Sequence, residues 1–458
     1  MIFQTLNPAT GELIKTFDFQ SDSQVSAALN VADETYQQDW KLRSVADRAQ
    51  IVKRAAAILR KNAKEYAGYL TLEMGKLIAE AEYEVELSAA ILDYYADNAE
   101  EFLKPQQLPG ASESLVVTEP IGVLVGIEPW NFPYYQLARV AGPQLVAGNV
   151  LLMKHAPSVP QCALAFARLF EEAGAPEGVY TNLFCTVDQI GHVIDDFRVR
   201  GVMLTGSERA GAAVAERAGR ALKKVILELG GSDPMIVLED SPLDSVIAAA
   251  AGSRLLNMGQ ACAATKRLIV VGQERGGQVL DGLVKVFNSM KAGDPADPTT
   301  TIGPLFSEAA LDNLLRQIDG AVKAGATLVT GGKRIDRPGF YLEPTIITGI
   351  SKTNPLHKEE AFGPVLTVYI VETEEEAIAV ANDTPYGLGS SVMTADLERA
   401  KRVAARIEAG MVFINSGVYT GPETPFGGVK NSGFGRELGA AGIAEFVNRK
   451  LIRVASAG

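Results

Sequence analysis

Residues 122–231 contain five short apolar runs with helical patterns between them: GVLVGI (122–127), NVLLMK (149–154), VYTNLF (179–184), VRGVMLTG (199–206) and KVILELGG (224–231). Runs that are apolar at successive positions are typical of strands buried on both faces of a sheet. Strands that alternate with helices form parallel sheets, because each helical crossover returns the chain to the same edge. This stretch therefore predicts an α/β fold with a parallel sheet covered by helices.

A second series of apolar runs begins after residue 233. Helical patterns lie between several of these runs, and EEEAIAVANDT (374–384) is one example. The same alternation predicts a second α/β unit. The runs are PMIVLED (234–240), RLIVVG (267–272), ATLVTGG (326–332), VLTVYIV (365–371) and GMVFINS (410–416).

The first hundred residues and the last segment have different patterns. In residues 48–103 apolar residues recur at intervals of three and four among Glu and Lys, which is typical of amphipathic helices packed on a larger body. SESLVVTEP (112–120) and FVNRKLIRVASAG (446–458) alternate instead and predict edge strands. Such strands pair with another subunit or face solvent, and both possibilities stay open.

Composition limits the class of protein. The chain has 458 residues, 47% of them hydrophobic, which is enough for two or three units with cores of their own. Its 43 Lys and Arg against 55 Asp and Glu give a net charge of −12, so we expect no nucleic-acid partner. The sequence shows neither a signal-peptide pattern nor an apolar stretch long enough to span a bilayer, so we expect a cytoplasmic protein without a membrane partner.

The three cysteines, Cys162, Cys185 and Cys262, lie far apart in the sequence and show no CxxC spacing. This pattern predicts neither a disulfide framework nor a metal site. It is compatible with a single reactive thiol.

Two strand ends carry residues suited to a phosphorylated ligand. In open parallel sheets, ligands bind beyond the carboxyl ends of the strands, where turns expose backbone N–H groups. Ser207 opens the helix after the run 199–206, Gly211 follows in that helix, and Lys154 ends another run. An ordinary turn with a helix N-cap and a solvated lysine would have the same residues, and the GxGxxG fingerprint is absent.

Three further residues have side chains suited to catalysis. Asn131 follows a strand, so its carboxamide can donate to an oxyanion, although Asn is also a common turn residue. Cys262 lies in the loop NMGQACAATKR (257–267), where its thiol is a suitable nucleophile provided that the local field lowers a pKa of about 8.5. Glu228 ends a strand beside two glycines, where a carboxylate can activate water. A buried inert thiol and a surface glutamate are the alternatives.

Six motifs occur in one order, and together they resemble those of the aldehyde dehydrogenase superfamily over essentially the full chain. The motifs are PWNFP (129–133), TGSERAG (205–211), LELGGSDP (227–234), GQAC (259–262), EEAFGPV (359–365) and PFGGVKNSGFGRE (425–437). The resemblance implies a Rossmann-like cofactor-binding domain (1–102 and 122–230), a second α/β catalytic domain (231–430) and a small β oligomerisation element (103–121 and 431–458). It also implies a homodimer or homotetramer.

The resemblance implies a mechanism as well. Cys262 would be the nucleophile, Asn131 and the Cys262 backbone N–H the oxyanion hole, and Glu228 the general base that directs water to a thioester. A nicotinamide cofactor would accept the hydride, with Glu360 on its ribose and Phe362 near the ring. The predicted cofactor-binding residues are Trp130, Lys154, Ser158, Gly206, Ser207, Gly211, Leu229, Glu360 and Phe362.

Pro157 bears on the choice between NAD and NADP. Family members that favour NAD often carry a glutamate three residues after the strand-end lysine, where it binds the ribose 2′-hydroxyl and repels a 2′-phosphate. Pro157 does neither, while Lys154 and Ser158 can accommodate a phosphate. We therefore predict that NADP is preferred over NAD.

The substrate prediction depends on Arg139. PWNFPYYQLARVAGPQ (129–144) and KHAP (154–157) resemble the succinate semialdehyde dehydrogenase branch, in which an arginine at this position binds the far carboxylate of the aldehyde. Thr420 matches a position that can donate a further hydrogen bond. A structural arginine is the alternative interpretation of Arg139.

Glu128 keeps a second class of substrate open. Relatives of this branch commonly have methionine there, and an anion beside the site would oppose an anionic substrate unless it is neutralised. A neutral or amino-bearing aldehyde is therefore the alternative substrate. A cysteine hydrolase or esterase is the less favoured function, because His155, His192 and His357 lie in contexts that do not suggest a partner for Cys262.

Overall fold

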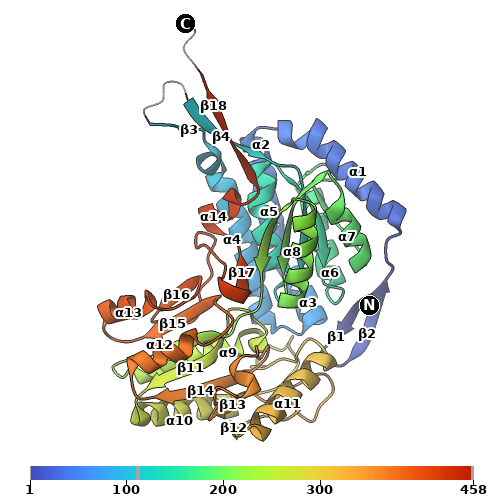
Figure 1. The fold of residues 1–458 in the computed structure, drawn as a ribbon. Helices are drawn as coiled ribbons and strands as arrows, with labels where there is room; N and C mark the ends of the chain where they lie inside the picture. Colours follow the sequence, from blue (N-terminus) through green and yellow to red (C-terminus); the bar gives the residue numbers. More distant parts are fainter. Residues whose placement is uncertain (1, 110–113, 455–458) are drawn as a thin grey trace.

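The computed structural model describes residues 2–109 and 114–454, and Figure 1 shows two α/β units with a projecting arm. The first sheet has the strand order β17-β9-β8-β5-β6-β7. Its strands are parallel, except that β17 pairs antiparallel with β9. They are β5 (Val123–Glu128), β6 (Val150–His155), β7 (Tyr180–Asn182), β8 (Val199–Thr205), β9 (Lys224–Glu228) and β17 (Gly433–Phe434).

The predicted parallel sheet is confirmed, and its strand order marks a ligand-binding position. From β5 the order runs to β6 and β7 on one side and to β8 and β9 on the other. Ligands of open α/β sheets bind at such a reversal, beyond the carboxyl ends of the strands. The helices that contact these strands are α1 (Asp22–Gln38), α5 (Pro133–Ala147), α6 (Pro160–Glu172), α7 (Val187–Asp195) and α8 (Glu208–Arg220).

The second sheet has the order β12-β13-β14-β11-β10-β15-β16, and β12 alone runs antiparallel to its neighbour within this described sheet. Its strands are β10 (Asp233–Val237), β11 (Thr265–Val271), β12 (Thr327–Thr330), β13 (Thr345–Thr348), β14 (Val365–Val371), β15 (Gly389–Met393) and β16 (Met411–Ile414). Its helices are α9 (Leu243–Leu255), α10 (Gln273–Ser289), α11 (Glu308–Lys323), α12 (Glu374–Asn382) and α13 (Leu397–Ala404). The second α/β unit is thereby confirmed. The sequence runs quoted above contain no counterpart of β13 or β15.

The N-terminal segment begins with a hairpin, which was not predicted, and continues as helices, which the periodicity of residues 48–103 predicts. The capping box of Ser21 starts the first of these helices by accepting from the Gln24 N–H. The elements are β1 (Phe3–Asn7), β2 (Glu12–Phe17), α1 (Asp22–Gln38), α2 (Val45–Lys61), α3 (Ala63–Met74) and α4 (Ile78–Leu103). Short 3₁₀ turns occur at η1 (Trp40–Leu42), η2 (Leu256–Gly259), η3 (Pro355–His357) and η4 (Lys430–Ser432).

The arm in Figure 1 consists of β3 (Gln106–Gln107), β4 (Ser114–Pro120) and β18 (Val447–Arg453), with α14 (Gly439–Ala444) at its base. The two alternating segments thus form strands, and β4 pairs antiparallel with β18. Residues 112–113 and 455–458 of the predicted segments lie outside the described residues. The domain bounds stay a prediction, and β17, which we assigned to the small β element, pairs with β9 in the first sheet.

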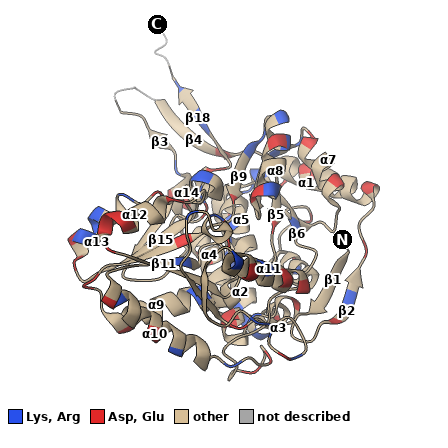
Figure 2. Ribbon diagram, turned by 60° about the horizontal axis from the view of Figure 1, so that its bottom comes forward, with Lys and Arg blue, Asp and Glu red and all other residues tan. Residues whose placement is uncertain are grey.

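Charged residues of both signs are intermixed on the outer helices in the view of Figure 2. Within residues 2–109 and 114–454, no helix is long and apolar enough to cross a membrane.

Candidate active site

A cavity of about 160 Å³ lies between α4, the start of α5 and the loop that precedes β11. Four of the predicted site residues line it: Cys262, Asn131, Arg139 and Thr420. They come from segments up to 289 positions apart (from Asn131 to Thr420), so the fold and not the local sequence brings them together. The cavity is therefore the candidate active site.

The loop before Cys262 has an unusual backbone. Asn257, Met258 and Gly259 have φ angles of 52°, 55° and 70°, so three successive residues are left-handed. A Cβ on Gly259 would lie 2.3 Å from the carbonyl oxygen of Gly363, so glycine alone fits there. This tight turn brings Cys262 to the cavity wall.

Asn131 is fixed against the same loop. Its Nδ2 donates to the Gln260 carbonyl at 3.0 Å, and its own carbonyl accepts from Asn257 Nδ2 at 2.9 Å and from Lys76 Nζ at 3.1 Å. The carboxamide nitrogen has two hydrogens, so one remains for a ligand oxygen. The geometry is suited to an oxyanion donor.

The electrostatic surroundings of the Cys262 thiol differ from our expectation. Burial raises its pKa to about 11, while the cations Lys266 and Arg139 act to lower it and Glu360 and Glu228 raise it further. Desolvation of the thiolate thus outweighs the two cations, and these residues alone do not supply the lowered pKa that was stated as the condition for a reactive thiol.

Glu228 ends β9 outside the lining of this cavity, yet its charge acts on Cys262. The side chain is buried, and neither carboxylate oxygen has a hydrogen-bond partner among the described residues. Burial raises its pKa well above the usual range and Glu437 adds to this, while Arg139 and Arg436 oppose it. A carboxylate with so few partners is suited to take up a proton.

Arg139 lines the cavity and already has a carboxylate partner. Its Nε lies 2.7 Å from Glu437 Oε2, and its Nη2 donates to Thr205 Oγ1 at 3.3 Å. The guanidinium also lies over the rings of Tyr135 and Phe426, 4.7 Å from each centroid. The structural interpretation of Arg139 thus has direct support, and its position in the cavity wall keeps the substrate-binding one open.

Thr420 is joined to a residue that sequence analysis missed. The hydroxyl groups of Thr420 and Tyr135 lie 2.7 Å apart, and both residues line the cavity. This pair supplies hydrogen-bonding groups on a wall that is otherwise largely apolar.

The predicted ribose ligand Glu360 lies close to the nucleophile loop. Its Oε1 is 2.9 Å from Lys266 Nζ and accepts from the Gly231 N–H at 3.2 Å. Lys266 also donates to the carbonyl groups of Ala261 and Cys262. One lysine therefore joins Glu360 to the Cys262 loop, a link that no motif indicated.

Phe362 and Trp130 belong to an aromatic group beside this loop. Their ring centroids are 5.8 Å apart with the rings edge to face, and Trp130 stacks on Phe306 at 3.4 Å. Phe306 was not predicted, because it lies outside every motif.

The turn from β8 into α8 has both the features of an N-cap and those of a phosphate site. Ser207 Oγ accepts from the Ala210 N–H at 3.3 Å, as an ordinary N-cap does. Gly206 N–H donates to the Glu228 carbonyl at 2.9 Å. Leu229 packs on Gly211 so closely that a Cβ there would lie 2.7 Å from Leu229 Cδ2.

Lys154 supports the fit of a phosphorylated cofactor to these strand ends. It ends β6 with a relative exposure of 9%, and its Nζ has no carboxylate partner among the described residues. Burial lowers its pKa. A buried ammonium group without an anion is stabilised by a bound phosphate, and Ser158 lies in the turn that follows.

The histidines do not form a catalytic pair with Cys262 in the described structure. His155 contacts the carbonyl oxygens of Glu128 and Pro133, and burial lowers its pKa to about 4. His357 contacts Tyr369 and Asp383. No group of three or more His, Cys, Asp or Glu suited to a metal ion occurs within the described ranges.

Comparison with known proteins identifies the family of this chain. Residues 1–452 match the aldehyde dehydrogenase family. A curated relative from Deinococcus radiodurans, named succinate-semialdehyde dehydrogenase [NADP(+)], is 50% identical over 98% of this chain and 94% of its own length. The solved structure of succinic semialdehyde dehydrogenase from Streptococcus pyogenes in complex with NADP+ has a TM-score of 0.97 and 46% identity, covering 99% of this chain and 100% of its own. The structure of Gox0499 has a TM-score of 0.98 and 51% identity over 99% of this chain and 100% of its own.

Proposed function

The chain belongs to the aldehyde dehydrogenase family, and from that premise we propose that it oxidises succinate semialdehyde to succinate with NADP+ as the preferred hydride acceptor. The observation that carries the proposal is the cavity itself. One cavity is lined by the thiol of Cys262, the amide of Asn131, the guanidinium of Arg139 and the two hydroxyl groups of Tyr135 and Thr420. An aldehyde with a second polar end fits such a cavity, because each end meets a matching group.

In the proposed mechanism, Cys262 loses its proton to solvent and its sulfur adds to the aldehyde carbon. Asn131 Nδ2 and the Cys262 backbone N–H donate to the oxygen that becomes negative. A nicotinamide cofactor held at the strand ends of the first sheet would supply the hydride acceptor. Loss of the hydride leaves the carbon bound to Cys262 as a thioester. Glu228 then takes a proton from water as the water oxygen attacks the thioester, and the thiolate leaves as the acid is released.

The cofactor proposal is supported by the strand ends of the first sheet. We propose that Lys154, Ser158 and the Ser207 turn with Gly206 and Gly211 hold its phosphates. Glu360 would bind the nicotinamide ribose, and Trp130, Leu229 and Phe362 would pack near the ring. Pro157 offers no carboxylate to a 2′-phosphate, which supports the preference for NADP.

We further propose a homodimer or homotetramer that forms through the arm. The compartment we propose is the cytoplasm, where thiols such as the free Cys162, Cys185 and Cys262 stay reduced.

The nucleophile is tested by comparing wild type with Cys262→Ala, with reduced cofactor followed by absorbance. The variant should lose turnover of every aldehyde, by at least about a thousandfold. Turnover that survives in Cys262→Ala would overturn the proposed mechanism. Cys185→Ala is the matched control, because that thiol is buried away from the cavity.

The substrate is tested through Thr420. Thr420→Val keeps the shape but removes the hydroxyl that meets Tyr135, so kcat/KM for succinate semialdehyde should fall by about tenfold. The same variant should oxidise butanal as wild type does, since butanal has no far carboxylate. If wild type itself prefers a neutral or amino-bearing aldehyde, the alternative substrate class replaces succinate semialdehyde.

A further inference from the structure

Three glutamates and one arginine form a buried group behind the cavity. Glu128, Glu228, Glu437 and Arg139 each have a relative exposure of 4% or less. The ion pair of Arg139 with Glu437 has been described, and Glu228 has a role in the proposed function. Glu128 has no role so far, and neither of its carboxylate oxygens has a hydrogen-bond partner within the described residues.

The sheet register directs Glu128 and Glu228 to the same side. Thr205 of β8 is the register partner of Glu228 in β9. Ile127 of β5 pairs with Leu204 of β8, so Glu128 is one step further along and lies in the row of Thr205. Residues in one row of a parallel sheet project from the same face. Both carboxyl groups therefore project toward Arg139, whose Nη2 contacts the Thr205 hydroxyl between them.

The charges of this group do not balance. Three ionised carboxylates beside one guanidinium would leave an excess of two negative charges in a desolvated interior, which is costly. The positive charge of Arg436 acts to lower the pKa of Glu228. The hydrogen bonds of Arg436 Nη1, however, go to the carbonyl groups of Gly428 and Gly435.

The other groups that face Glu128 add no cation. His155 of β6 contacts the Glu128 carbonyl and is neutral at physiological pH, because burial lowers its pKa to about 4. The Tyr180 phenol of β7 is neutral, since burial and the charge of Glu128 raise its pKa. Burial raises the pKa of Glu128 itself well above its usual range, and Glu437 adds to this while Arg139 opposes it. Once ionised, Glu128 raises the pKa of Glu228.

We propose that Glu128 is a positioning residue for thioester hydrolysis, whose buried carboxyl group sets the proton affinity of Glu228 through the charge cluster around Arg139. This inference deepens the proposed function and rests on the role of Glu228 as the base. An ionised Glu128 disfavours an ionised Glu228, so Glu228 becomes a stronger base but loses its proton only at a higher pH.

The chemical step stays the one given above. Glu228 takes one proton from the attacking water, a C–O bond forms, the C–S bond breaks, and Cys262 leaves as thiolate. The proton leaves Glu228 for solvent before the next turnover. Glu128 forms no bond to substrate, and its charge changes how readily Glu228 accepts and releases that proton.

The experiment compares the pH dependence of acyl-enzyme hydrolysis in the full-length wild type and in Glu128→Gln. Enzyme is mixed with NADP+ and succinate semialdehyde, and the decay of acylated Cys262 is followed by rapid quench and mass spectrometry between about pH 6 and about pH 9. Removing a buried like charge should move the midpoint of the rising limb down by about one pH unit. The rate at the plateau should fall by a few-fold, because the base is weaker.

Controls separate this outcome from simple damage. Glu73→Gln removes another buried glutamate, which contacts Thr5 and the start of α6, and should leave the midpoint unmoved. Glu128→Met repeats the loss of charge if Glu128→Gln folds poorly. An unmoved midpoint, a midpoint moved to higher pH, or a rate lowered equally at all pH values would overturn the inference.

The role of Glu228 has its own readout. Glu228→Gln should leave the acyl-enzyme long-lived at every pH. If it hydrolyses normally, the proposed base fails, whatever Glu128 does.

Discussion

At the scale of single residues, a buried ion pair supports the turn that carries Asn131. Lys76 pairs with Glu84, and their side chains are 0% and 2% exposed. Lys76 also donates to the Asn131 carbonyl, while Glu84 Oε1 accepts from the N–H groups of Tyr134 and Tyr135 at 2.9 and 3.2 Å. The pair thus joins α4 to the first turn of α5, next to the predicted oxyanion donor.

Lys76→Met should lower the free energy of unfolding by about 3–5 kcal/mol, because it leaves the Glu84 carboxylate buried without its cation. Urea denaturation followed by circular dichroism measures the change. Lys53→Met is the matched control, since Lys53 pairs with Asp97 on the surface with side chains 55% and 54% exposed. That control should change the free energy by less than about 1 kcal/mol. Equal effects of the two variants would contradict the prediction.

Pro157 should control the cofactor preference. A carboxylate at this position would lie near the strand-end Lys154, where it would repel a 2′-phosphate and accept from a 2′-hydroxyl. Pro157→Glu should therefore shift the ratio of kcat/KM for NADP to that for NAD by at least about tenfold toward NAD.

Pro157→Ala is the control for loss of the ring alone. The Pro157 carbonyl accepts from the Gln4 N–H at 2.9 Å, and both variants keep that bond. A ratio that changes equally in the two variants would show that backbone freedom, and not charge, decides the preference.

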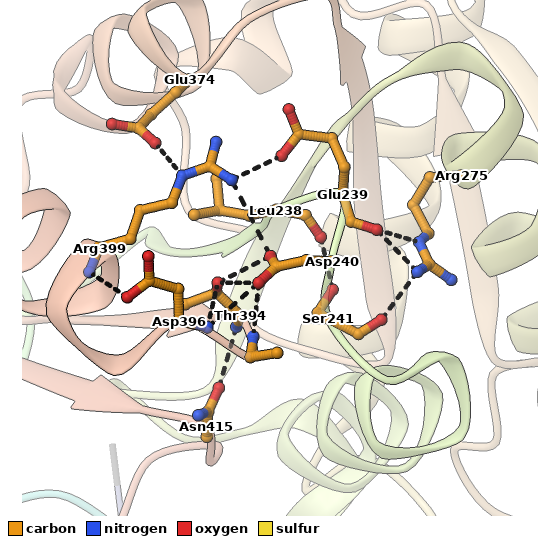
Figure 3. A network of polar contacts seen from close by, with 11 residues as sticks. Leu238, Glu239, Asp240, Ser241, Arg275, Glu374, Thr394, Asp396, Arg399 and Asn415 are labelled. Atoms are coloured by element: carbon orange, nitrogen blue, oxygen red, sulfur yellow. Dashed lines mark hydrogen bonds and ion pairs between the residues drawn. The ribbon is translucent and has the colours of Figure 1, made fainter.

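At the scale of elements, Asp240 joins two turns of the second α/β unit. Figure 3 shows its carboxylate facing the segment between β15 and α13. Oδ2 accepts from the N–H groups of Ala395 and Asp396 at 3.0 and 3.1 Å, and the Thr394 hydroxyl donates to both oxygens. Arg399 of α13 adds ion pairs to Glu374 and Glu239.

Asp240→Ala should lower the free energy of unfolding by about 1–2 kcal/mol, because two backbone donors and a hydroxyl lose their acceptor. Burial acts to raise the pKa of Asp240, but the Thr394 hydroxyl and these N–H groups leave it below the ordinary value of 3.8. A lowered folded-state pKa stabilises the fold above the unfolded-state value, and this stabilisation is lost as the pH falls through the folded-state pKa.

Urea denaturation at several pH values measures both parts of this prediction. The difference between wild type and Asp240→Ala should stay constant from neutral pH to about pH 4.5 and should shrink below that. Asp319→Ala, which removes an exposed partner of Lys323, should have little effect at any pH. A difference that grows as the pH falls would contradict the prediction.

The elements also show how far the sequence allows prediction. The strand β6 was predictable, because each of its positions is apolar or ends the strand and all are buried. The strand β15, with the sequence GSSVM, was not, because its two serines are buried inside a sheet that the local pattern does not reveal. The strand β13, TIIT, was not predictable either, because its 4 residues are too few to show an alternation of apolar and polar positions.

At the scale of the whole molecule, the sequence does not show which distant segments are in contact. The residues of the site were predicted as separate motifs at strand ends and in one loop. The pairing of Arg139 with Glu437 joins positions 298 apart, and that of Tyr135 with Thr420 joins positions 285 apart. Local spacing carries no signal for such contacts, so the sequence allowed two interpretations of Arg139.

The arm should hold the assembly together. Its outer strand β18 pairs with β4 on one side, and Leu451 and Ile452 are 58% and 42% exposed. The other edge of β18 has no strand partner among the described residues, and such an edge is a template for pairing with another chain. A second copy of this chain is the partner we propose.

Leu451→Lys combined with Ile452→Lys should lower the mass in solution from that of the homo-oligomer to that of the monomer, because charges desolvated in the interface cost more than the strand pairing contributes. Size-exclusion chromatography with light scattering measures the mass. Lys450→Ala on the same strand is the matched control and should keep the wild-type mass, since that side chain already carries a charge, paired with Glu119. A wild type that is monomeric, or a double variant that stays assembled, would place the interface elsewhere.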